Sequence, residues 1–138
     1  MPLIREFTIL CDDIRVENTG KFILIGVYTP HIVIPTLPFG FSTLCFFTGF
    51  TSDAPARYQI RAQLRHLETG HVVGELIGMM QHAAPGLGTG VIKFPNVIFN
   101  QGGRYNFILT IEQHPEPFVY DFDVILQAAQ LPPAQPAR

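Results

Sequence analysis

Apolar and polar side chains alternate along much of this chain, and a period of two predicts β-strands. The alternation runs through residues 57–64, 104–112 and 118–127. No window shows the periodicity and end caps of a helix. Twelve glycines and twelve prolines divide the apolar segments into short pieces. The pattern therefore predicts an all-β fold, a single antiparallel β-sandwich of about eight strands with immunoglobulin/C2-like or Greek-key connections.

Three other segments, at residues 21–28, 41–50 and 91–99, are apolar on both faces. Strands of this kind are central in a sheet or covered on both sides. We expect one outer face of the sandwich to be covered, and self-association would provide such a cover. Pro95 lacks a backbone donor and therefore predicts a sheet edge or a bulge in the third segment.

The chain is long enough to form one packed core, since 47% of its 138 residues are apolar. We assign residues 1–127 to the sandwich domain and expect residues 128–138, rich in proline and alanine, to form a flexible tail. Cys11 and Cys45 both have apolar neighbours, which favours buried free thiols, although a disulfide between them stays open.

Charge and hydropathy exclude two classes of partner. Nine Lys and Arg against eleven Asp and Glu give a net charge of −2, without the basic excess of a nucleic-acid binder. Arg5 and Glu6 interrupt what would be the apolar part of a signal peptide. No uncharged run approaches the ~20 residues of a membrane span. We therefore expect a cytoplasmic protein that binds neither nucleic acid nor membrane.

The segment CDDIRVENTGK at residues 11–21 concentrates charge in a chain with only 14% charged residues. A loop at residues 18–20 predicts a hairpin that places an ion-pairing ladder on one face, made of Asp13, Arg15, Glu17 and Lys21. Asp12 then falls on the apolar face opposite Gly26, where a carboxylate needs hydrogen-bond donors. Asp12 and Arg15 are candidate binding residues, and a structural role for Asp12 is the alternative.

The last hairpin supplies two further candidates. A four-residue loop at 114–117 predicts that Asp121 faces Thr110 and that Asp123 faces Ile108. Asp121 and Asp123 then lie on one face at about the strand repeat of ~7 Å. Carboxylate pairs at such separations serve glycoside hydrolysis, but an outward strand face offers neither a cleft nor a raised pKa. A solvated face is the alternative for both.

Other polar residues have structural explanations. A loop at residues 68–70 predicts that His66 and His71 point to opposite faces as solvated or rim side chains, so we expect no metal site there. Arg57, Arg61 and Arg65 form a basic ridge on a solvated strand face. Tyr105, at the start of a strand, suits a tyrosine that hydrogen-bonds back across a corner of a sandwich.

The segment ILCDDIRVENTGKFILIGVY at residues 9–28 resembles the opening of a bacterial family of uncharacterised proteins, a domain of unknown function. The resemblance covers the first fifth of the chain well. A Gly-x-Tyr-x-Phe strand of that family also corresponds to residues 103–107. The resemblance implies a small cytoplasmic bacterial β-domain without an assigned activity, and it supplies no catalytic residue.

These observations predict a non-catalytic binding or interaction module that needs no cofactor. We expect its protein partner, or a second copy, to contact the loops at 29–40 and 81–90 or an exposed sheet edge. One alternative is a structural component of a phage particle or larger complex. The other is a small hydrolase or carbohydrate-binding protein that uses Asp12, or Asp121 with Asp123.

Overall fold

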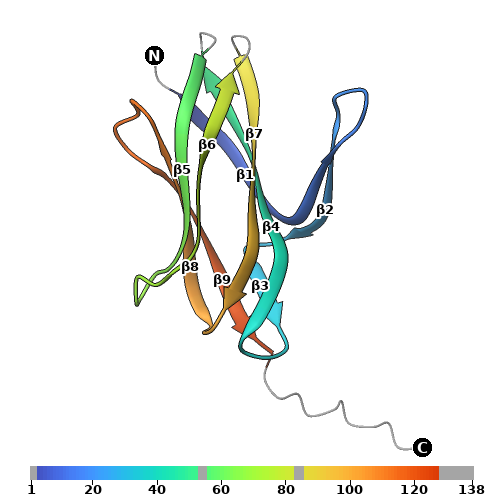
Figure 1. The fold of residues 1–138 in the computed structure, drawn as a ribbon, viewed down its shortest axis with the longest axis vertical. Helices are drawn as coiled ribbons and strands as arrows, with labels where there is room; N and C mark the ends of the chain where they lie inside the picture. Colours follow the sequence, from blue (N-terminus) through green and yellow to red (C-terminus); the bar gives the residue numbers. More distant parts are fainter. Residues whose placement is uncertain (1–2, 53–55, 83–85, 128–138) are drawn as a thin grey trace, which may run out of the picture.

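A computed structural model describes residues 3–52, 56–82 and 86–127 of the chain. These residues form nine strands in two facing sheets (Figure 1). The predicted all-β sandwich is therefore confirmed, with nine strands in place of about eight. The described segments include no helix of the length and hydropathy needed to cross a membrane. The predicted tail at 128–138 lies outside the described residues.

The first sheet, called sheet A here, has four antiparallel strands. In spatial order they are β2 (Phe22–Tyr28), β1 (Ile4–Val16), β4 (Phe39–Ser52) and β7 (Gly86–Phe99). Strand β4 lies between β1 and β7, and Pro95 lies on the edge strand β7, as its missing donor predicts. Strand β2 forms the opposite edge.

Sheet B has five strands, in the order β3 (His31–Ile34), β9 (Phe118–Leu126), β8 (Gly103–Ile111), β5 (Ala56–His66) and β6 (Val72–His82). The pairing of β3 with β9 is parallel, so the prediction of a purely antiparallel fold is wrong at this edge. Strand β4 returns to lie beside β1, the return that defines a Greek key, although β3 pairs in the opposite sheet.

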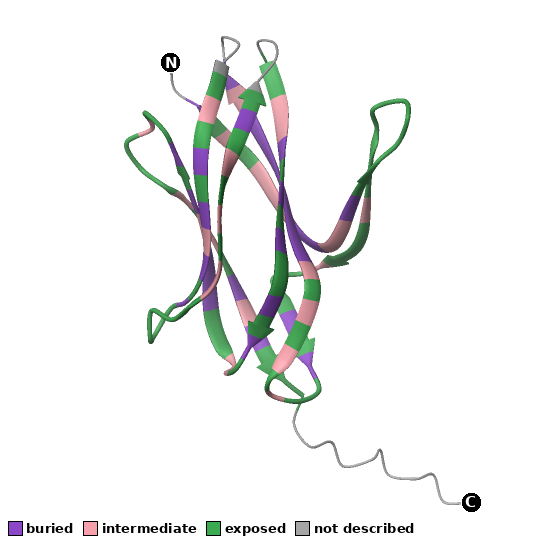
Figure 2. Cartoon of the chain, viewed as in Figure 1, coloured by how far each residue is buried: buried purple, intermediate pink, exposed green. Residues whose placement is uncertain are grey.

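The main core lies between the sheets and is rich in aromatic rings. Phe46 of β4 stacks on Phe107 of β8, with ring centroids 4.0 Å apart. Side chains alternate between the faces of a strand, so Phe46 points inward while its neighbours Cys45 and Phe47 point outward. Figure 2 shows alternating buried and more exposed bands along β5 and β7, whereas the middle of β4 is buried on both faces.

A second buried cluster covers part of the outer face of sheet A. It contains Cys11, Ile14, Cys45 and Phe47, with Phe7, Ile9 and Leu24 packed against it. Strand β1 bends near Asp12, and the β1–β2 hairpin beyond it projects beside the sandwich (Figure 1). We call residues 12–28 the arm. The bend lets Ile14 join the outer cluster although Leu10, of the same strand parity, lies in the main core.

The pairing within the arm follows the predicted register. Ile14 pairs with Leu24, and Val16 pairs with Phe22. The predictions for the strands that are apolar on both faces are only partly correct. Strand β4 is central and buried as expected. Strand β2 is instead an exposed edge of its sheet. Strand β2 is therefore not central in its sheet and the described residues leave it uncovered, while a cover by self-association stays a prediction.

Two loop predictions also change. In the last hairpin Leu109, not Gln113, pairs with Phe118, so the predicted register is wrong by four residues. The segments at 29–40 and 81–90 were expected to be long loops. Strands β3 and β4 take up half of the first segment, β6 and β7 contain the described residues of the second, and residues 83–85 are outside the described part. Neither segment forms one long loop in the parts described, and a role for them in binding stays a prediction.

Candidate functional site

Asp12 lies at the bend of the arm. The hydroxyl of Tyr28 donates a hydrogen bond to Asp12 Oδ1, and the hydroxyl of Thr43 donates to the Asp12 backbone oxygen at 2.9 Å. Gly26 has a left-handed φ of 68°, and a methyl group there would lie 2.9 Å from Asp12 Cγ. Gly26 thus leaves the room for Asp12 that the register predicts.

The donor that the Asp12 carboxylate was expected to need is the hydroxyl of Tyr28. Burial raises the pKa of Tyr28, and the hydrogen bond to Asp12 raises it further. The phenol therefore keeps its proton and remains a donor. This arrangement fixes the arm at its bend and commits the Asp12 carboxylate to a contact inside the protein.

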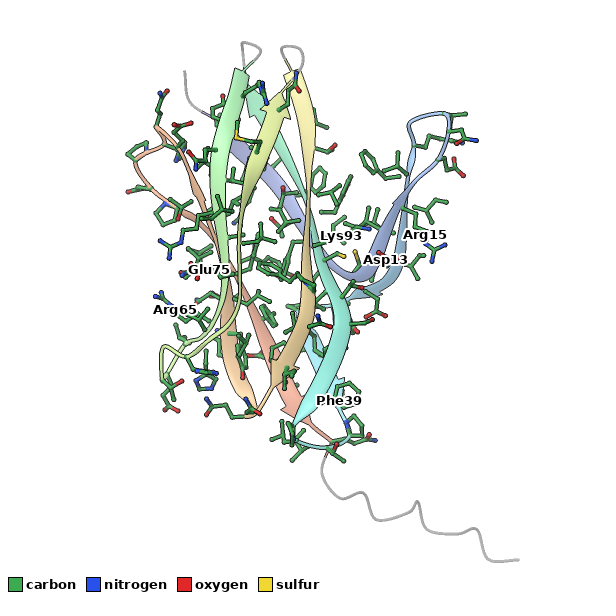
Figure 3. All side chains as sticks on the ribbon, in the orientation of Figure 1. Asp13, Arg15, Phe39, Arg65, Glu75 and Lys93 are labelled. Atoms are coloured by element: carbon green, nitrogen blue, oxygen red, sulfur yellow. The ribbon has the colours of Figure 1, made fainter. Side chains whose placement is uncertain are left out.

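The other charges of the arm neutralise one another. Lys93 Nζ lies 3.1 Å from Asp13 Oδ1, and Arg15 Nε lies 3.4 Å from Asp13 Oδ2. The hydrogen bond from Lys93 is the main cause that lowers the pKa of Asp13. Lys21 Nζ is 3.5 Å from Glu17 Oε1, which confirms the predicted pair at the hairpin loop. Figure 3 labels Asp13, Arg15 and Lys93 on this side of the molecule.

Both thiols are free and buried, and the structure brings them together. Cys11 and Cys45 are direct partners across β1 and β4, within the outer cluster. Burial raises the pKa of Cys11 to about 11, helped by the neighbouring Cys45. Burial also raises the pKa of Cys45. Such thiols carry little thiolate near neutral pH, so they pack as small apolar side chains.

Asp121 and Asp123 each contact a polar side chain of the neighbouring strand β8. Because the register of β8 and β9 differs from the prediction, Asp121 faces Asn106, whose Nδ2 donates to it at 2.9 Å. Asp123 faces Arg104, with 3.1 Å between Arg104 Nε and Asp123 Oδ1. His31 Nδ1 lies 3.4 Å from the other oxygen of Asp123.

His66 is buried, so the prediction that it is a solvated or rim side chain is wrong. Its Nδ1 accepts a hydrogen bond from the Thr69 amide at 3.2 Å, and Nε2 lies 3.1 Å from the Gly102 carbonyl oxygen. His66 also packs edge-on against Tyr105, whose hydroxyl donates to the Gln101 carbonyl at 2.6 Å. The tyrosine therefore makes the predicted corner hydrogen bond.

A pocket of about 450 Å³ lies beside this corner. It is lined by His66, Leu67, Glu68, Gly102, Gly103 and Arg104. Both ring nitrogens of His66 have partners within the protein, and Arg104 is paired with Asp123. Among the described residues, no group of three or more His, Cys, Asp or Glu side chains is arranged to hold a metal ion.

The basic ridge on β5 is partly neutralised. Arg61 Nε donates to Glu75 Oε2 at 2.7 Å, and Gln63 donates to the same oxygen at 3.0 Å. Figure 3 shows Arg65 and Glu75 on the opposite side of the sandwich from Asp13 and Lys93. The charged candidates are thus distributed over both outer faces and engaged with near neighbours.

The outer strand of the arm, β2, carries a row of exposed apolar side chains. Phe22, Ile23, Ile25 and Val27 of β2 are all exposed, and Val27 keeps 59% of its surface accessible. Strand β2 is also a sheet edge, and no strand among the described residues pairs with its outer side. An exposed apolar edge strand can pair with another strand. The sequence named an exposed edge only in general terms, because apolar content does not distinguish an edge strand from a central one.

Comparison with known families agrees with the resemblance noted in the sequence. A family model described as "Family of unknown function (DUF6941)" matches residues 6–119. No curated protein matches the chain. The family match spans both sheets, from β1 to the start of β9. The chain belongs to this family of unknown function.

Proposed function

We propose that this DUF6941 member is a non-catalytic interaction module that binds a protein partner through the exposed edge of its arm. One observation carries the proposal: β2 presents Phe22, Ile23, Ile25 and Val27 to solvent along an edge of sheet A. Contiguous exposed apolar surface of this kind usually marks an interface. A partner strand added to β2 would gain backbone hydrogen bonds, and the alternate side chains would select it.

The absence of catalysis is part of this proposal and draws support from how the acids are used. Asp12 accepts from Tyr28 in the arm, Asp13 is paired with Lys93, and Asp123 is paired with Arg104 in the other sheet. Catalytic acids and bases usually converge in one cleft with their pKa values set apart. These carboxylates are instead held in separate contacts on two sheets.

A capture experiment tests the proposal. The tagged full chain, an Ile25→Lys variant and an Ile77→Lys variant would each be used to retain proteins from a lysate that contains an untagged copy of the chain. Ile77 is the matched control, because it is an exposed isoleucine on the edge strand β6 of the other sheet. Circular dichroism would confirm that all three chains are folded.

We expect at least one protein, the untagged copy included, to be retained by the wild type and by Ile77→Lys but lost with Ile25→Lys. A lysine at position 25 would place a charge in the contact and force its desolvation. Retention of the same proteins by all three chains would contradict a role for the arm, and the proposed function would be wrong.

A further inference from the structure

We infer that the partner of β2 is β2 of a second copy of this chain, paired antiparallel about a two-fold axis. This inference rests on the proposed function and names the partner of that same surface. Pairing about such an axis joins two four-stranded A sheets into one continuous eight-stranded sheet.

Among the four edges of the two described sheets, β2 has the least protection against pairing with another strand. Natural edge strands are guarded by prolines, charges, bulges or short length. The edge β7 carries Pro95 and a left-handed Asn96, and β3 is only four residues long. The edge β6 carries the Arg61–Glu75 pair beside it and a register shift at its end.

Strand β2 has a glycine interruption at Gly26, but its ladder to β1 is continuous from Phe22 to Ile25. The side chains from Phe22 to Tyr28 include no charged group. An apolar edge of seven residues is ~23 Å long, which is enough for a full strand partner. The edge is therefore available for backbone pairing along most of its length.

The charges of the arm and of the whole chain are compatible with self-pairing. Four charged side chains of the arm pair with each other or with Lys93, namely Asp13, Arg15, Glu17 and Lys21, and Asp12 accepts from the Tyr28 hydroxyl. Each charged group of the arm therefore already has a partner within its own chain when two arms meet. The chain as a whole has a net charge of only −2, which gives weak repulsion between copies. A two-fold axis brings identical surfaces together, and an apolar, neutral surface is complementary to itself.

The exposed apolar area of the arm is close to what a specific dimer interface needs. Ile23, Ile25 and Val27 share one face of β2, and Val16 and Phe22 lie on the other. Together they give the edge an exposed apolar patch of roughly a few hundred Å² per copy that extends over both faces. Two such patches together approach the ~1,000 Å² at which specific interfaces begin. In the antiparallel arrangement Ile23, Ile25 and Val27 of one copy lie beside the same three residues of the other. These side chains would be the centre of the contact.

The test measures the oligomeric state of the full chain by sedimentation velocity over a range of protein concentrations. Ile25→Lys and Val27→Lys probe the contact, and Ile77→Lys is the control. We expect a wild-type dimer whose dissociation constant rises at least about a hundredfold in each arm variant, because each dimer would bury two unpaired charges. The control should stay within about threefold of the wild type.

Hydrogen exchange on the wild type distinguishes strand pairing from side-chain contact alone. At concentrations that favour the dimer, amides of residues 22–28 should exchange more slowly, while those of β6 should not change. A dimer without this protection would overturn the edge pairing. Loss of the dimer in Ile77→Lys to the same degree as in the arm variants would overturn it as well.

The inference and the proposed function can fail separately. A wild type that stays monomeric at high micromolar concentration overturns the self-pairing. If Ile25→Lys still abolishes capture of a different protein, the proposed function survives with a different partner. If neither self-association nor capture depends on the arm, both are wrong.

Discussion

Replacing Gly26 with alanine tests what holds the arm at its bend. Two costs are expected. Gly26 has a φ of 68°, and a non-glycine residue in this region costs about 1 kcal/mol. The added methyl group would also lie 2.9 Å from Asp12 Cγ, so the carboxylate must move away from Tyr28. Losing a hydrogen bond to a charged group costs about 1.5–3 kcal/mol, and partial exposure of Asp12 favours the lower end.

We therefore expect Gly26→Ala to lower the free energy of unfolding by roughly 2–4 kcal/mol. Two glycines separate the causes. Gly20 has a φ of 88° but open space around it, so Gly20→Ala should cost only about 1 kcal/mol. Gly78 has neither a left-handed φ nor a close neighbour, so Gly78→Ala should change stability by less than about 0.5 kcal/mol.

Urea unfolding followed by circular dichroism gives these differences. All variants must be measured at one protein concentration, since a dimer would make the midpoint depend on it. If Gly26→Ala is no more destabilising than Gly20→Ala, the contact between Asp12 and Tyr28 does not stabilise the bend. The explanation given for Asp12 would then be wrong.

Two further predictions concern the groups packed under and beside the arm. At pH 8 the native thiols should react slowly with a disulfide reagent, because a Cys11 pKa of about 11 in place of 9.0 lowers the thiolate fraction about a hundredfold. Rapid labelling of the folded protein, at the rate seen in urea, would contradict their burial. The pKa of Asp13 is lowered in the folded state, mainly by Lys93, so this pair stabilises the protein above the ordinary aspartate pKa of about 4 and less as the pH falls. The stability difference between wild type and Lys93→Met should therefore shrink on acidification, and a constant difference would show that Lys93 acts by packing alone.

Side-chain alternation and loop chemistry predicted the parts of the fold that depend on near neighbours. The hairpin loop at residues 18–20 fixed the pairing of Glu17 with Lys21 and of Ile14 with Leu24. The corner hydrogen bond of Tyr105 joins residues only four apart. Such features follow from residues that are adjacent along the chain, so the sequence specifies them directly.

The predictions that were wrong involve partners that are remote in sequence, or loops that do not close into a tight hairpin. In the β8–β9 hairpin Pro115 and Pro117 have no amide to donate, and Ile111 pairs with β5 instead of β9. His66 is buried against Gly102 and Tyr105, which are far from it in the sequence. His66 has the same strand parity as the buried Ile60, Ala62 and Leu64, so extending the alternation of this strand by one more position would have placed His66 on the inner face, although it would not have named these contacts.

The parallel pairing of β3 with β9 has a consequence for how the chain is made. His31 pairs with Asp123, so in the described structure β3 finds its backbone partner in the final strand. During synthesis β3 leaves the ribosome long before β9 exists, and contacts between such distant segments form slowly. Sheet B can therefore close only after β9 has been synthesised, and a chain cut short before Phe118 would release β3 with an unsatisfied ladder that favours aggregation.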